Sequence, residues 1–501
     1  MDMVMAKREY LIVLDSIANL FEGQVDPHFA EQMTDWGERV LLYRQYVRGE
    51  HDVYLTNTMR RMLNLKGRKF ETFSADYTDM VVRMMSERLV VERIEAIVDN
   101  PNSPIVSPSN GDGDIEDDGD DRAQEWVDDL LKKNRFDALQ MDVHEATARD
   151  GDVFVIVDFD EAMNCARLNL NLAWDGDVGV IPIYSRSNPR EMMAAVKVMY
   201  VDAEIKRATV YYADRVEVYE TDGSGSAFQP AGDSVPWMPG VLPVIHFSNR
   251  RRSGRSTGIS ELAKMIALQD ILNRTLVSMV MTSEFSAFPV LFAKGFKPPA
   301  QVAPGDVIYY NESDPTKLQY AEFTKIDGSS LSGYIEQINK LIDLISEVTQ
   351  TPIASVLGTN PSGEALKQRE SGLLTKIRGA HVKLGNAWED VLKVAHGVEM
   401  AYKAKNKPPM ILMFDTQWKD ASIRSDLDVI TQAGMVFDRV QSMPLYLEMV
   451  SDVTGWDETK RQEILQAQAE QTAATMGNFS NLLGSNPNNE FGLMMNGVGV
   501  N

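Results

Sequence analysis

The sequence predicts an α+β fold, because long runs of helical periodicity flank one cluster of short β-branched segments. The helical runs occupy residues 1–95 and return after residue 258. Between them, segments rich in valine, isoleucine and tyrosine are separated by turn residues, which is typical of a mostly antiparallel sheet. A length of 501 residues allows about three domains. This class of fold alone names no function.

Composition excludes several classes of protein. Fifty basic residues against 73 acidic ones give a net charge of −23, the opposite of what gripping nucleic acid phosphates requires. That charge does not exclude a protein that nucleic acid slides past. The single cysteine, Cys165, excludes an intrachain disulfide and fits a reducing compartment. We expect no signal peptide and, since no run of 18 apolar residues occurs, no membrane-spanning helix.

The first 95 residues are predicted to be helical. Residues 38–50 place apolar side chains near one face, and residues 76–96 do the same over about five turns. The proline-containing, strongly acidic stretch 100–121 has little to bury, so it is predicted to be a mobile surface loop. Another helix is predicted over residues 123–148.

The acidic stretch also contains a near match to a calcium-binding EF-hand loop. Asp114, Glu116, Asp118, Gly119 and Glu125 stand at ligand and turn positions of that pattern. However, the preceding proline-rich segment cannot supply the entering helix. A solvated acidic loop is the favoured interpretation, with weak calcium binding as the alternative.

Four segments are predicted as strands because they are rich in β-branched and aromatic residues. They are residues 151–159, 194–201, 208–220 and 243–247.

Three long helices organise the second half. Residues 258–285 predict a helix of roughly 40 Å, and residues 331–350 carry isoleucines at alternating spacings of three and four. The third helix, 364–405, contains four glycines. Because glycine in a helix interior costs about 1 kcal/mol relative to alanine, these predict bends or close backbone contacts. The glycines are Gly372, Gly379, Gly385 and Gly397.

The end of the chain predicts one strand at 408–418 and two or three helices over 423–473. The tail after residue 476 has no periodicity, so it is predicted to be disordered.

Two motifs resemble enzyme signatures. The stretch GTNPSGEA has the glycine spacing of a phosphate loop, but Glu364 and Ala365 replace its lysine and hydroxyl, so a nucleotide site is disfavoured. The stretch GRSTG fits a hydrolase elbow around Ser256. The preceding strand ends too early for an elbow, so we favour Ser256 or Thr257 as the cap of the following helix. No zinc motif occurs among the six histidines and one cysteine, and we expect neither enzyme activity nor a cofactor.

One basic cluster interrupts the acidic sequence. It consists of Arg250, Arg251, Arg252 and Arg255. Either it forms a solvated corner, or it pairs with acidic residues of a neighbouring subunit, which the planar guanidinium does well. We favour the second interpretation.

Five segments resemble, in order and spacing, the portal proteins of tailed bacteriophages of the long-tailed type. The resemblance covers Tyr43 to about Ala473. The segments are YRQYVRGEH (43–51), SERLVVERIEA (86–96), ARDGDVFVIVDFD (148–160), GISELAKMIALQDILNRTL (258–276) and TPIASVLGTNPSGEALKQRESGLLTKI (351–377).

The resemblance implies a phage portal fold: a ring of about twelve subunits around a central channel at one capsid vertex. Its implied parts are an α+β wing (1–257, with the strand 407–421 returning to it), paired long stem helices (258–285 and 331–350), a small α/β clip (286–330), a tunnel loop (351–362), a long kinked tunnel helix (363–406) and a helical crown (422–475).

The resemblance also implies a function. The ring would be the channel for packaging and ejection of double-stranded DNA, without sequence specificity and without a membrane. It would dock the large terminase and the head–tail adaptor and contact the major capsid and scaffold proteins. It would assemble in the host cytoplasm and remain in the virion. The alternatives are a channel-free capsid-associated structural protein and a serine hydrolase using Ser256.

Within this scheme the loop that resembles a phosphate loop is expected to project into the channel. Its DNA-facing residues would be Thr359, Asn360, Pro361 and Ser362. Ser362 would also cap the next helix, followed by Gly363 and Glu364, where the helix dipole favours an anion.

Overall fold

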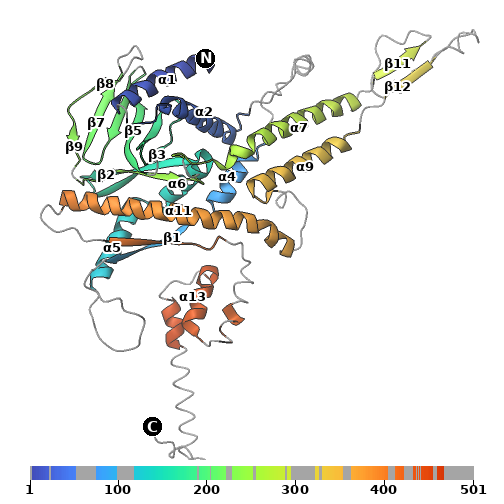
Figure 1. Cartoon of the computed structure of the whole chain (residues 1–501). Helices are drawn as coiled ribbons and strands as arrows, with labels where there is room; N and C mark the ends of the chain where they lie inside the picture. Colours follow the sequence, from blue (N-terminus) through green and yellow to red (C-terminus); the bar gives the residue numbers. More distant parts are fainter. Residues whose placement is uncertain are drawn as a thin grey trace, which may run out of the picture. The chain divides into compact units, whose positions relative to one another are not determined.

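The chain forms two compact units, residues 1–421 and 422–501, which are described separately (Figure 1). The computed structural model describes residues 3–21, 24–51, 75–98, 118–188, 191–203, 205–221, 228–237, 239–251, 255–287, 290–294, 322–326, 330–353, 363–403, 412–421, 433–435, 437, 439, 442–454 and 460–467.

A three-stranded antiparallel sheet lies at the centre of the first unit. Its order is β10-β2-β3, with β2 Asp152–Asp160, β3 Cys165–Leu172 and β10 Val244–Ser248. Strand β2 is buried on both faces. Val153, Val155 and Val157 enter one hydrophobic core, whereas Phe154 and Ile156 enter another. Because side chains alternate along a strand, this sheet separates the two cores.

The second core lies between a larger sheet and the first two helices. The sheet has the order β4-β5-β6-β7-β8, with β9 also pairing with β7. Helices α1 and α2 pack against each other beside it (Figure 1). The elements are α1 Met3–Leu20, α2 Phe29–Val47, β4 Gly179–Tyr184, β5 Met192–Tyr200, β6 Lys206–Tyr211, β7 Arg215–Glu220, β8 Gln229–Pro230 and β9 Val235–Pro236. Residues 208–220, predicted as one strand, are therefore the hairpin β6–β7.

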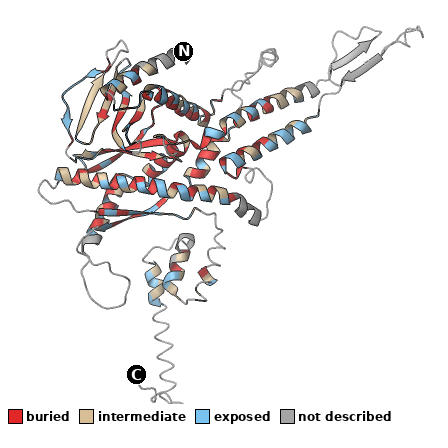
Figure 2. Cartoon of the chain, in the orientation of Figure 1, coloured by how far each residue is buried: buried red, intermediate tan, exposed pale blue. Residues whose placement is uncertain are grey.

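The first core contains α4 Thr78–Ser86, α5 Asp118–Lys133, α6 Phe136–Asp150 and the long helix α11 Gly363–Lys403. Helix α11 contacts β2, β3 and β10, and its buried residues recur at spacings of three and four (Figure 2). Strands β1 Val91–Val98 and β13 Leu412–Trp418 form a two-stranded antiparallel sheet that also packs on α11. The predicted return of the strand after α11 toward the N-terminal region is thus present as the β1–β13 pairing.

Two predicted helices are wrong in extent. The helix over 76–96 ends at Ser86 and is followed by β1, in which Val91, Ile94 and Ala96 are buried. Pairing with β13 outweighs local helix propensity here. The helix over 123–148 is two helices, since Arg135 adopts a left-handed conformation (φ 50°) that breaks it.

The paired helices of the second half are α7 Ile266–Ala287 and α9 Ser332–Thr349, which lie side by side (Figure 1). Beyond them, β11 Val290–Lys294 and β12 Glu322–Ile326 pair antiparallel. The first helix was predicted to begin at Gly258. It is instead preceded by a 3-10 turn, η1 Glu261–Lys264, and begins at Ile266.

Two of the four α11 glycines lie close to a neighbour. A Cβ on Gly385 would lie 3.3 Å from Trp418 Nε1, and one on Gly372 would lie 3.5 Å from Gln350 Cβ. Gly379 and Gly397 have nothing within 4 Å of that position. The 3.5 Å distance is ordinary van der Waals contact, so a close approach is found at Gly385 alone of the four, and there the neighbour is a side chain rather than backbone.

In the second unit, α13 Met443–Thr454 buries Leu447 and Val450. The predicted disordered tail, 476–501, lies outside the described residues. Among the described helices, none combines the length and apolar character that crossing a bilayer requires.

Candidate functional site

Segments far apart in the sequence meet near the ends of α7 and α9 that lie against the sheets. They are the end of α2, the α6–β2 connection, the turn before α7 and the middle of α11. We call this region the helix junction, and define it by its polar residues Tyr46, His51, Asp152, Asn249, Ser260, Glu261, Gln269, Asp270, Asn273 and Lys376.

The centre of the helix junction is a buried ion pair. Glu261 Oε2 lies 2.7 Å from Lys376 Nζ, and the two side chains are 0% and 4% exposed. The same ammonium donates a hydrogen bond to the carbonyl oxygen of Thr349, 2.8 Å away at the end of α9. Burial lowers the pKa of Lys376, and the charge of Glu261 opposes that shift. One ammonium group thus joins η1, α9 and α11.

The other carboxylate oxygen of Glu261 is also occupied. Asn249 Nδ2 donates to Oε1 at 2.8 Å, and Arg250 Nε lies 3.2 Å from the same atom. The Arg250 contact is an ion pair without hydrogen-bond geometry. A buried carboxylate requires such compensation, because an uncompensated charge in the interior is strongly destabilising.

The side chain that caps the turn before α7 is Ser260, so the predicted caps Ser256 and Thr257 are wrong. Ser260 Oγ accepts a hydrogen bond from the backbone N–H of Leu262 and donates one to the carbonyl oxygen of Arg149. Ser260 has extended backbone angles (φ −57°, ψ 147°), which suit an N-cap. Helical structure begins after residue 260, too far along the chain for Ser256 to cap it.

Two glycines allow the backbones of this region to approach. A Cβ on Gly258 would lie 2.2 Å from the carbonyl oxygen of Gly151 and 2.6 Å from that of Asn249. Gly151 has φ 89°, and a Cβ there would lie 2.8 Å from the nitrogen of Ser260. Only glycine fits either position without movement of the backbone.

A second buried carboxylate, Asp152, organises the sheet side of the helix junction. It accepts hydrogen bonds from Trp36 Nε1 (3.1 Å) and from the backbone N–H of Gly258 (2.7 Å). His246 Nε2 lies 2.7 Å from Asp152 Oδ1, and His246 Nδ1 lies 2.6 Å from the hydroxyl of Tyr184. These partners are satisfied when Nε2 carries the proton and Tyr184 donates to Nδ1. Burial raises the pKa of Tyr184 to about 12.

The end of α2 is tied to α7 by a separate set of hydrogen bonds. Tyr46 donates its hydroxyl proton to Asp270, and Asn273 Nδ2 lies 2.8 Å from His51 Nδ1. Gln269 donates a hydrogen bond to the carbonyl oxygen of Ala75. The backbone N–H of Ala75 in turn donates one to Asn273 Oδ1. The motif residues at 43–51 and 258–276, separated in sequence, are thus neighbours in the fold.

A further buried pair fixes α2 beside the α6–β2 connection. Arg44 donates to Asp150 through Nε and Nη2, to Asp175 through Nη1 and to the carbonyl oxygen of Ala173. The side chain of Asp150 is 0% exposed. Two donors of one guanidinium thus share Asp150 Oδ2, and these charge-assisted bonds fix α2 against the end of α6 and the segment that follows β3.

The predicted basic cluster is divided. Arg250 pairs with Glu261 of its own chain, and the Arg251 guanidinium carbon lies 4.6 Å from the centroid of the Tyr184 ring. Arg255 is exposed, and Arg252 lies outside the described residues. The assignment of the basic cluster to a contact between subunits stays a prediction.

The predicted DNA-facing loop residues, Thr359, Asn360, Pro361 and Ser362, lie outside the described residues. Gly363 and Glu364 are the first two residues of α11, and the assignment of Ser362 as its cap stays a prediction.

Two of the four calcium candidates, Asp114 and Glu116, lie outside the described residues. Asp118 opens α5, which also contains Glu125. Within the described ranges, no three His, Cys, Asp or Glu residues are grouped so that they could hold a metal.

Sequence reasoning missed the two buried aspartates, Asp150 and Asp152. A usable signal existed, because a strand with burial on both faces rarely begins with charged residues unless they are paired. The partners, Arg44 and His246, could not be read from the sequence.

Residues 37–475 match the protein family described as "Phage portal protein, SPP1 Gp6-like". The portal protein of Mycobacterium phage L5 is 23% identical over 341 residues, covering 64% of this chain and 68% of the relative. The portal protein of Mycobacterium phage D29 is 24% identical over 346 residues, with the same coverage. Among solved structures, the neck of a native GTA particle computed with C12 symmetry superposes with a TM-score of 0.41 at 10% identity, covering 81% of this chain and 94% of that chain.

Proposed function

Because the chain belongs to the SPP1 Gp6-like family of phage portal proteins, we propose that it forms a ring of about twelve copies at one capsid vertex, with double-stranded DNA passing through the channel. The ring serves DNA packaging and ejection. It docks the large terminase during packaging and the head–tail adaptor afterwards, and it contacts the major capsid and scaffold proteins. The chain acts there as a structural protein, first in the host cytoplasm and then in the virion.

The observation that carries this proposal is the helix pair α7 and α9 with the β11–β12 pair beyond it. A long antiparallel helix pair with a small sheet at its far end suits a stem and a clip. The helix junction supports the same assignment, since Lys376 holds the start of η1 and the end of α9 against α11. Helices α1, α2, α4, α5 and α6 with the sheets other than β11–β12 correspond to the wing, and the second unit to the crown.

The tunnel loop is assigned to residues 351–362, between α9 and α11. The two helices on either side of it are joined, because Lys376 on α11 bonds to Thr349 at the end of α9. The loop offers neutral polar side chains at Thr359, Asn360 and Ser362. These form weak contacts with passing phosphates, while the net charge of −23 prevents tight adhesion of DNA.

Deletion of Thr359–Pro361 tests the DNA contact. We expect intact rings but a reduced amount of DNA packaged or retained per particle, measured by genome content of purified heads. Deletion of three tail residues, Ser480–Leu482, is the control and leaves DNA content at the wild-type level. Wild-type packaging and retention in the loop deletion would contradict the proposed contact.

The serine hydrolase alternative requires a histidine that can take a proton from Ser256. His246 is the histidine nearest to Ser256 in the sequence. Both ring nitrogens of His246 are engaged, by Asp152 and by Tyr184, which leaves neither to take a proton from Ser256. We therefore expect no labelling of Ser256 by a fluorophosphonate, with a known serine esterase as the positive control. Labelling that disappears in Ser256→Ala would restore the hydrolase.

The channel-free alternative predicts a different mass. A capsid-associated protein without a channel would stay a monomer or dimer at all concentrations, whereas the proposed ring does not.

A further inference from the structure

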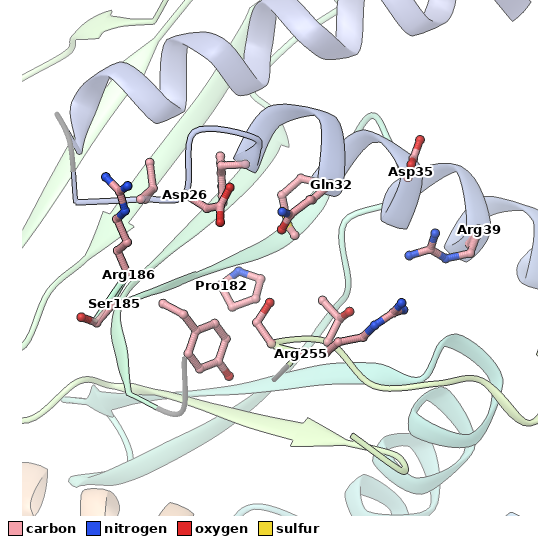
Figure 3. A pocket seen from close by; sticks show the side chains of 14 residues that line it. Asp26, Gln32, Asp35, Arg39, Pro182, Ser185, Arg186 and Arg255 are labelled. Carbon is pink, nitrogen blue, oxygen red and sulfur yellow. The ribbon is translucent and has the colours of Figure 1, made fainter. Parts of the chain in front are cut away.

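A pocket of about 500 Å³ lies between the start of α2, the end of β4 and residues 255–257 (Figure 3). Three guanidinium groups line it, from Arg39, Arg186 and Arg255, and all three residues are exposed. Figure 3 shows Arg39 and Arg255 on one side of the pocket and Arg186 on the other. We call it the arginine pocket.

These arginines differ from three others of the same unit in having no carboxylate partner among the described residues. Arg44, Arg149 and Arg250 are each held by a carboxylate of their own chain. Within the part of the chain that the structure describes, no carboxylate pairs with the three guanidinium groups of the arginine pocket. Their donors are therefore available to an external acceptor.

The pocket also contains two carboxylates. Asp26 accepts a hydrogen bond from the backbone N–H of His28, and Asp35 has a contact of its own. The remaining polar lining is neutral, and the guanidinium of Arg251 lies 4.6 Å from the ring centroid of Tyr184, which lines the pocket. Positive charge thus exceeds negative charge at the site.

We propose that the arginine pocket binds the acidic segment 111–121 of a neighbouring copy of this chain. The segment reads GDGDIEDDGDD, and every residue in it except three glycines and one isoleucine is acidic. Arginine forks bind carboxylates bidentately, so a chain of closely spaced carboxylates complements guanidinium groups placed around one pocket. In a protein of net charge −23, this segment offers the guanidinium groups of Arg39, Arg186 and Arg255 an acceptor from the chain itself.

The two ends of the segment favour a contact between copies. Strand β1, which precedes it, and helix α5, whose first turn begins within it at Asp118, belong to the core on the α11 side of the central sheet. The arginine pocket is lined by Val25, Phe29 and Met33, which belong to the core on the other side. The central sheet therefore separates the segment's attachment points from the pocket of the same chain. This inference rests on the proposed ring, which supplies the neighbouring copy.

A peptide titration tests the ligand. The receptor is the full chain with Asp112, Asp114, Glu116 and Asp117 changed to Asn or Gln, so that its own segments do not compete. A fluorescent GDGDIEDDGDD peptide should bind, more weakly as salt rises, and at least about tenfold more weakly to a receptor that also carries Arg39→Glu and Arg255→Glu. The control, Lys340→Glu with Lys383→Glu, makes the same charge change on exposed helix positions and should retain binding.

Three outcomes would overturn the proposal: no binding of the peptide, equal binding by the Arg39→Glu/Arg255→Glu receptor, or equal binding of a peptide with all carboxylates neutralised. Tighter binding of a DNA duplex that displaces the peptide would also overturn it and would identify a phosphate site instead.

A disulfide test distinguishes a neighbouring copy from the same chain. The only native cysteine, Cys165, is buried. Chains with Thr257→Cys and chains with Asp114→Cys are mixed and oxidised. A disulfide-linked dimer in the mixture supports the contact between copies, whereas a link formed only within doubly substituted chains contradicts it. If the protein forms rings but does not bind the peptide, only the proposed ligand of the arginine pocket is contradicted. If it binds the peptide but does not form rings, the proposed assembly is contradicted.

Discussion

Lys376 on α11 and Glu261 on η1 place charged atoms 2.7 Å apart in the interior, although 115 residues separate them in the sequence. The ammonium also reaches Thr349, so the pair connects the two helices that flank the proposed tunnel loop to the turn that starts α7.

Removal of one partner should be costly. Lys376→Met leaves the buried Glu261 carboxylate with the more distant, partly exposed Arg250 as its cation, so we expect the free energy of unfolding to fall by up to about 3–5 kcal/mol. The measurement is urea denaturation of the unassembled chain followed by circular dichroism.

The control lies on the same helix. Lys383 is exposed, so Lys383→Met should change the free energy of unfolding by no more than about 0.5 kcal/mol. The double variant Glu261→Gln with Lys376→Met should recover part of the loss, because the buried carboxylate and the buried ammonium are both removed. If Lys376→Met is as stable as the control, the pair has no structural role.

Substitution of glycine by alanine should have opposite effects at Gly258 in the helix junction and at Gly397 on α11. Gly258→Ala places a Cβ against two backbone carbonyls and should lower the free energy of unfolding by about 1–3 kcal/mol. Gly397→Ala, on α11 with open space around it, should raise it by up to about 1 kcal/mol. Differential scanning calorimetry of both variants tests this contrast, and equal effects of the same sign would contradict the described backbone approach.

Buried His144 should make stability depend on pH. Its Nδ1 lies 2.7 Å from the carbonyl oxygen of Leu89, and its Nε2 accepts a hydrogen bond from Trp388. Burial lowers the pKa of His144 from 6.5 to about 4. Between these values the unfolded chain binds a proton that the folded chain does not. Stability is therefore fully present above pH 6.5 and is lost as pH falls toward 4, by about 3 kcal/mol for this group.

His144→Gln isolates that contribution. Burial also lowers the pKa of His381 and of His396, so wild type and variant share a common slope from those groups. The variant should show a smaller decrease in the free energy of unfolding between pH 6.5 and pH 4 than wild type. The exposed His28→Gln variant should follow wild type. Identical pH curves for His144→Gln and wild type would be incompatible with a neutral buried imidazole.

Elements with a strong, uninterrupted period could be predicted from the sequence. The isoleucine spacing of α9, the proline-free run of α11 and the β-branched run of β2 all give the structures found. Strand β1 could not be predicted in the same way, because VVERIEAIV continues a helical pattern, and only its pairing with β13, more than 300 residues later, makes it a strand. The break at Arg135 carries no glycine or proline to mark it.

The helix junction was predictable only as separate motifs. The segments that resemble portal proteins contain Tyr46, Ser260, Glu261, Asn273 and Lys376. Their contacts depend on how distant elements pack, which no local pattern encodes. The cap shows this limit, since Ser256, Thr257 and Ser260 are equally good caps by residue type, and the hydrogen bond of Ser260 to Arg149 decides between them.

The central claim is that this chain assembles into a portal ring, and the mass and symmetry of the purified full-length protein test it most directly. Native mass spectrometry should give an assembly of about 670 kDa, which corresponds to about twelve chains of 56.1 kDa. Negative-stain class averages should show rings with a central hole. A protein that stays a monomer or dimer at all concentrations, and that scaffold or capsid protein does not drive into rings, would contradict the account.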